Sequence, residues 1–70
     1  MTADEWIEGF TRELETERPS EEQVKEILEL AATAAHASER IAAPVACFIA
    51  GRTGRPLADL RAAAERVGGE

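Results

Sequence analysis

The feature that most restricts the fold of this chain is a run of ten apolar residues, Ile41 to Ala50. Pro44 suits the first turn of a helix, where the missing N–H leaves no hydrogen bond unmade. A helix that is apolar on all sides must be covered by protein on all sides. The run has half the roughly 20 residues that a membrane-spanning helix needs, so it predicts a buried helix over residues 44–51.

A chain of 70 residues can cover such a helix only with difficulty. A domain of this size buries roughly 60% of the surface that its unfolded chain exposes, and it often needs a disulfide, a metal or a partner. One cysteine and one histidine exclude an internal disulfide and a self-contained zinc site. We therefore expect no metal or cofactor, and a second copy or another protein against Val45, Phe48 and Ile49.

A first helix is predicted over residues 3–17. Thr2 and Glu5 have the spacing of a capping box, in which each side chain bonds the backbone amide of the other residue. Pro19 ends the segment because it disfavours helical backbone at the residue before it. One face carries the apolar residues of this segment, which recur at helical spacing: Ala3, Trp6, Ile7, Phe10 and Leu14.

Trp6 and Phe10 lie one helical turn apart and are expected at the centre of the core. If they were exposed, they would instead anchor an interface, since aromatic residues dominate binding hot spots. Gly9 between them costs a helix about 1 kcal/mol relative to alanine, which suggests a close backbone contact at that position.

A second helix is predicted over residues 21–42, beginning at a second capping box formed by Ser20 and Gln23. The C-terminal half of this segment is almost all alanine, which predicts close packing of another helix there. A fourth helix is predicted over residues 56–67 and ends at Gly68. Together these segments predict one all-α domain, a compact bundle or an orthogonal cluster of about four short helices over the full 70 residues.

The charge of the chain is acidic overall but unevenly spread. A net charge of −6 argues against nucleic acid or an anionic membrane as the main partner. Residues 1–30 carry −7 and residues 31–70 carry +1, so the second half is the better place for an anionic ligand, although an ordinary solvated surface also explains the difference. Charged residues interrupt the first 15 positions, which argues against a secretory segment and makes the cytoplasm the simplest expectation.

Four basic residues are candidates for binding an anion. His36 and Arg40 lie one turn apart and could together bind a phosphate or carboxylate, although favourable placement near a helix C-terminus explains them equally well. Arg52 and Arg55 precede a helix N-terminus, where backbone amides favour anions. A helix stop followed by a turn is the alternative explanation of that connection.

Catalysis is not expected. Cys47 lies within the apolar run, where it suits core packing better than nucleophilic attack. A nucleophile needs a base within hydrogen-bond reach, and His36, the single histidine, belongs to another predicted helix. The many carboxylates show no sign of an acid and base pair.

The chain resembles a small bacterial helical domain of unknown function that occurs alone or appended to molybdopterin-guanine dinucleotide nucleotidyltransferases of molybdenum cofactor synthesis. The resemblance implies a cytoplasmic accessory module that has no established catalytic residues. It covers roughly residues 6–51 and is carried by Trp6, Leu30-Ala31, Ala35-His36, Arg40, Ala42-Ala43-Pro44, Phe48 and Gly51.

Three functional hypotheses follow. The domain could be an accessory module of molybdenum cofactor handling that contacts a nucleotidyltransferase or a molybdoenzyme. It could be a homodimeric module that only brings chains together, as the apolar third segment indicates. It could also bind a small anion or a nucleotide through its four candidate basic residues.

Overall fold

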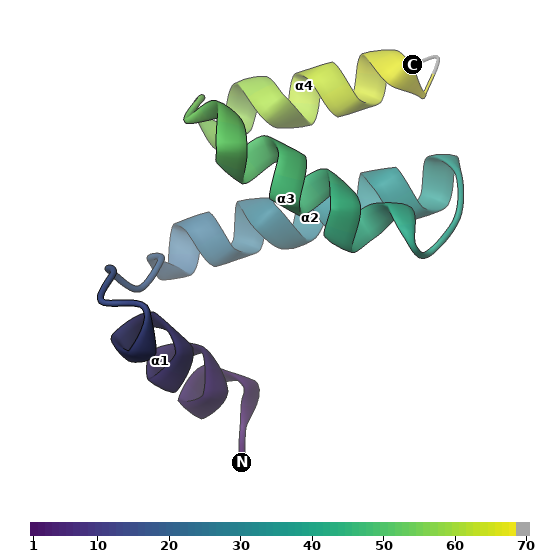
Figure 1. Cartoon of the computed structure of the whole chain (residues 1–70). Coiled ribbons are helices and arrows are strands. Elements are labelled where there is room, and N and C mark those ends of the chain that lie inside the picture. The colour runs from purple at the N-terminus through teal and green to yellow at the C-terminus, as the bar shows by residue number, and fades with distance from the viewer. Residues whose placement is uncertain (69–70) are drawn as a thin grey trace.

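The computed structural model describes residues 1–68, and these residues form four α-helices and no strand (Figure 1). The helices are α1 (Ala3–Glu13), α2 (Glu21–Ala37), α3 (Ala42–Thr53) and α4 (Leu57–Val67). The prediction of an all-α chain of four short helices is confirmed. Positions 69 and 70 of the predicted domain lie outside the described part. No helix within residues 1–68 has both the length and the apolar character needed to cross a membrane.

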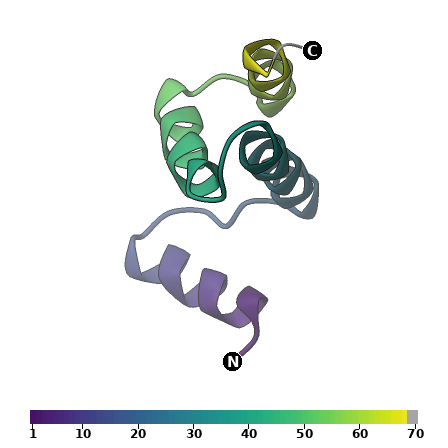
Figure 2. The same ribbon diagram turned by 90° about the vertical axis from the view of Figure 1, so that its right-hand side faces the viewer.

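Helix α2 organises the fold, because α3 and α4 each pack against it. An ion pair between Arg61 and Glu29, 3.2 Å apart, also joins α4 to α2. We call these three helices, residues 21–67, the three-helix body. Helix α1 makes no extensive contact with any other helix and lies at the end of the molecule opposite α4 (Figures 1 and 2). The chain therefore consists of a body and a helix beside it, and it measures 38 × 24 × 18 Å.

Helix α1 ends at Glu13 and not at residue 17 as predicted. Glu15 has a φ of 54°, in the left-handed region that ends helices. The amide of Thr16 donates to the carbonyl of Thr11 and the amide of Glu15 to that of Arg12, at 3.0 and 3.1 Å. These two bonds form a Schellman motif, which satisfies the last carbonyls of the helix several residues before Pro19 can act. The capping box predicted at Thr2 is present at the other end.

Helix α2 begins at the predicted capping box but ends at Ala37, before the predicted end at residue 42. The Ser38 backbone leaves the helical region, with φ −141° and ψ −99°, while its hydroxyl donates to the Ala34 carbonyl at 2.9 Å. The chain then reverses over residues 38–41, which lets the apolar α3 return along α2. Residues 38–41 contain no proline or glycine, so we attribute the end of α2 to the packing of α3 against it.

Helix α3 is longer than predicted at both ends, and Gly54 rather than Gly51 terminates it. Gly54 has a φ of +71°, whereas Gly51 lies inside the helix. The hydroxyl of Thr53 donates to the Ala50 carbonyl at 2.8 Å and accepts from the Arg55 amide at 3.1 Å, which closes the turn into α4.

These two glycines should respond oppositely to the same substitution. Gly51→Ala is expected to raise the free energy of unfolding by about 0.5–1 kcal/mol, because alanine favours the helix and its Cβ would meet nothing within 4 Å. Gly54→Ala is expected to lower it by about 1 kcal/mol, because the left-handed backbone strains an L side chain. Urea denaturation of both variants at one protein concentration measures the difference. Equal shifts would contradict the assignment of the helix end to Gly54.

The core of the described chain is very small. Only Leu30, 4% exposed, and Ala50, 8% exposed, are buried among residues 1–68. A monomeric globular protein of 7.6 kDa has about 4,300 Å² of accessible surface, whereas this chain has 5695 Å². The excess of about 1,400 Å² accompanies ten exposed large apolar side chains, namely Met1, Trp6, Phe10, Leu14, Leu28, Ile41, Val45, Phe48, Ile49 and Val67.

Candidate functional site

The aromatic pair on α1 is exposed, so the prediction that it centres the core is wrong. Trp6 and Phe10 stack with ring centroids 4.9 Å apart and remain 56% and 48% exposed. The predicted close contact at Gly9 is also absent, since a Cβ built there meets no atom within 4 Å. Leu14 continues the same face and is exposed as well. The structure thus meets the condition, exposure, under which the sequence predicts that Trp6 and Phe10 anchor an interface.

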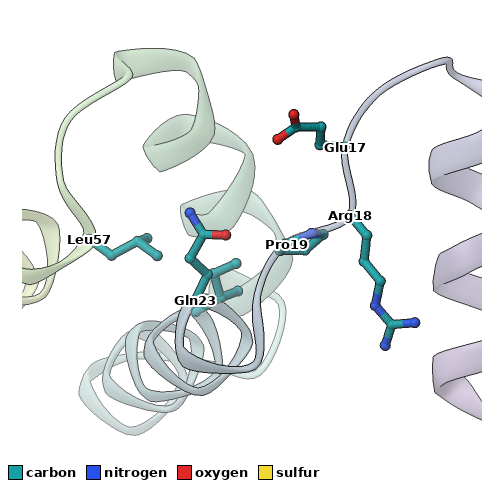
Figure 3. A pocket seen from close by; sticks show the side chains of 6 residues that line it. Glu17, Arg18, Pro19, Gln23 and Leu57 are labelled. Atoms are coloured by element: carbon teal, nitrogen blue, oxygen red, sulfur yellow. The ribbon is translucent and has the colours of Figure 1, made fainter.

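Arg18 links α1 to the connection that precedes α2. Its guanidinium lies 2.7 Å from a carboxylate oxygen of Asp4 and 3.4 Å from one of Glu8. Figure 3 shows Arg18 extending from the connection toward α1, away from Leu57 of α4. These ion pairs hold α1 against its own connection, with its aromatic face left without a partner from the body.

The same connection borders a hollow of about 370 Å³ at the starts of α2 and α4 (Figure 3). Its lining is Glu17, Arg18, Pro19, Gln23, Ile27 and Leu57. The guanidinium of Arg18 is already engaged by two carboxylates, so the hollow offers no free cation from this residue. Its polar lining is then a carboxylate and an amide, which is too little to define a ligand site.

The predicted interface residues of α3 all lie at the surface. Phe48 is 66% exposed, and Val45 and Ile49 are each at least half exposed. The guanidinium of Arg52 lies over the Phe48 ring, 5.0 Å from its centroid, in a cation–π arrangement. The sequence predicts that protein covers this helix on all sides, but a single chain leaves its outer side exposed.

A long apolar groove lies between α3 and α4, with α2 as its floor. Its volume is about 530 Å³, and half of its lining residues are alanines. The larger apolar residues of the lining are Leu30, Ile49, Leu60 and Val67. The alanine-rich half of α2 was expected to pack closely against another helix. Both α3 and α4 pack against α2, and a Cβ built at Gly68 would lie 3.5 Å from the Cβ of Ala37. Ala34 and Ala37 also line the groove between α3 and α4. Alanines at helical spacing on three successive helices are the sequence signal for this groove.

The four candidate anion-binding residues fall into two separate pairs. His36 is in the last turn of α2 and Arg40 in the connection that follows, whereas Arg52 and Arg55 are at the other end of α3. A helix of 12 residues spans about 18 Å, so one small anion cannot reach both pairs.

The surroundings of each pair also favour structural roles. His36 lines a depression of about 610 Å³ together with Glu65, whose carboxylate disfavours an anion there. Arg52 is engaged with the Phe48 ring. The geometry at Arg55 fits the helix stop and turn that the sequence offered as an alternative.

Cys47 is half buried in α3. Within residues 1–68, no group of three or more histidine, cysteine, aspartate or glutamate side chains is placed to hold a metal ion. The apolar groove, the α3 surface and the α1 face are thus the features that could act on another molecule.

Comparison with known proteins gives a family and no function. No curated protein and no solved structure matches this chain. The sequence pattern of one family, described as a domain of unknown function, matches residues 1–69. The resemblance to a domain of unknown function is confirmed at that level, and the chain belongs to the DUF6457 family.

Proposed function

We propose that this domain is a non-catalytic protein-interaction module that binds a partner protein through the outer surface of α3. The observation that carries the proposal is the exposure of Val45, Phe48 and Ile49 on the most apolar helix of the chain. Exposed apolar surface of this kind typically marks a site of association.

Phe48 and Arg52 give this surface a centre. Aromatic residues and arginine are the side chains most enriched at the energetic centres of interfaces. The stacking of the Arg52 guanidinium on the ring orders both side chains before a partner arrives, which lowers the entropy cost of binding. Burial of Phe48 by a partner would also remove the largest exposed apolar side chain of α3 from water.

We propose further that the module acts in the cytoplasm as an accessory to molybdenum cofactor synthesis, with a nucleotidyltransferase as its partner. The cytoplasmic setting and the nucleotidyltransferase partner are supported by the family resemblance. Four of the residues that carry the resemblance, Ala42-Ala43-Pro44 and Phe48, lie in α3, the helix that exposes the proposed surface.

The proposed surface can be tested with a photo-crosslinking amino acid at position 48, produced in the source cell. We expect a discrete crosslinked protein from position 48 and none from position 62, an exposed alanine on α4 that serves as the control. Equal crosslinking from both positions would reject the α3 surface as a binding site.

The identity of the partner is tested with the purified nucleotidyltransferase. Titration calorimetry should show binding to the wild-type chain and to Ala62→Glu, and a loss of affinity of about tenfold or more for Phe48→Glu. Absence of binding to the wild-type chain would reject the nucleotidyltransferase as partner.

A further inference from the structure

We infer that two copies of this chain form a dimer by exchanging α1, so that α1 of each copy lies in the groove between α3 and α4 of the other. The inference goes beyond the proposed function because it concerns the groove and α1. The groove shares only Ile49 with the proposed α3 surface, since Val45 and Phe48 do not line it.

The two surfaces are complementary in size. Half of the residues that line the groove are alanines, which leave room for large side chains and let a helix approach closely. Helix α1 carries large apolar side chains, Trp6, Phe10 and Leu14, at successive four-residue spacings, so that they form one ridge. The ridge spans about 12 Å and the α3 wall of the groove about 18 Å, so the groove can accept the whole ridge.

The two surfaces are also complementary in charge. Residues 3–13 hold four acids and one arginine, a net charge of −3. Residues 42–67, which form both walls of the groove, hold four arginines and two acids, a net charge of +2. Opposite charges around an apolar contact favour its formation and fix its orientation.

The placement of α1 favours a second copy over the chain's own groove. The left-handed residue Glu15 and the ion pairs of Arg18 with Asp4 and Glu8 direct α1 along its own connection, at the opposite end of the molecule from α4 (Figure 1). A two-fold axis would then let each copy give its α1 and receive that of its partner, which closes the assembly at two chains.

The surface area agrees with a dimer. If each copy buried the excess of about 1,400 Å², the pair would bury about 2,800 Å², within the range of obligate homodimers. A pair of chains would thereby reach the burial that a single chain lacks.

The test uses the full chain and the single tryptophan of the sequence, Trp6, as a reporter of the α1 environment. Sedimentation equilibrium should give about twice the 7.6 kDa chain mass at high micromolar concentration. Trp6 fluorescence should shift to shorter wavelength over the same concentration range as the dimer forms. A monomer with a blue-shifted Trp6 at all concentrations would show α1 in its own groove and overturn the inference. A monomer with a solvent-exposed Trp6 throughout would overturn it as well, in favour of another protein in the groove.

Two variants disable one side of the contact each. Phe10→Glu alters the ridge on α1, and Val67→Glu adds a negative charge to the groove at a residue that is 89% exposed, so neither should unfold the body. Each is expected to weaken the dimer by about tenfold or more. Phe48→Glu is the matched control and should leave the dimer intact, although under the proposed function it should weaken partner binding. Equal weakening by all three variants would contradict the assignment of the dimer to α1 and the groove.

A mixture of the two variants distinguishes exchange from other dimers. Phe10→Glu retains an intact groove and Val67→Glu an intact α1, so their mixture should form heterodimers through one complete contact. Neither variant should dimerise alone at the same concentration. A mixture that remains monomeric would overturn the exchange of α1.

Discussion

Replacement of Leu30 by alanine is expected to destabilise the chain by about 3 kcal/mol. Leu30 is the most buried large side chain of residues 1–68 and lies on α2, the helix against which both α3 and α4 pack. A domain of this length has a total stability of about 4–10 kcal/mol. The loss of one side chain would therefore remove roughly 30% to 75% of that stability, because few other buried contacts exist to compensate.

The measurement is urea denaturation followed by circular dichroism, at one protein concentration because dimerisation would make the midpoint concentration-dependent. Leu28→Ala is the matched control, since it is the same change two positions away on the same helix, at a side chain that is 63% exposed. Its effect should stay within about 0.5 kcal/mol. Similar losses for both variants would mean that Leu30 is not the centre of the core.

An aspartate in place of Ala50 is expected to unfold most of the chain. Ala50 is the second buried residue of the described chain and lies on α3. Ala50 borders the apolar groove and is 8% exposed, so a carboxylate there would lie against apolar side chains with little access to water and no partner, at a cost of several kcal/mol. That cost is comparable with the total stability of about 4–10 kcal/mol.

The helical signal at 222 nm and its cooperative loss on heating measure this effect. Ala62→Asp is the control, since Ala62 is an exposed alanine on α4 and its substitution carries only the lower helix propensity of aspartate, about 0.6 kcal/mol. A folded Ala50→Asp chain with an unchanged melting temperature would show that α3 does not pack through Ala50.

Local signals in the sequence predicted the helix starts well. The capping boxes at Thr2 and Ser20 form with the expected reciprocal hydrogen bonds, because all of their atoms lie within four residues of each other. The predicted start of the fourth helix at residue 56 is one residue early, because Pro56 is the N-cap of α4 and has a ψ of 140°. The hydrogen bonds of a capping box do not depend on the rest of the fold.

The helix ends were predicted less well. Glu15 adopts a left-handed backbone that its side chain does not signal, and Ser38 leaves the helix although no proline or glycine requires it. Gly51 was expected to end α3, but Gly54 does so. The end of α2 accompanies the packing of α3 against it, which is a contact distant in sequence. The ends of α1 and α3 are local turns at Glu15 and Gly54, for which the residue types give only a weak signal.

For the candidate surfaces too, the sequence predicted some features and only the tertiary structure showed the others. An all-α chain with too little core and with an apolar segment that requires cover follows from the residue pattern, because periodicity and chain length fix how much surface can be buried. The position of the uncovered surface followed only from the tertiary structure, which places α1 outside the body and so exposes Trp6 and Phe10. The pattern of apolar residues on a helix predicts that one face is buried, but it does not predict whether the surface that covers this face belongs to the same chain.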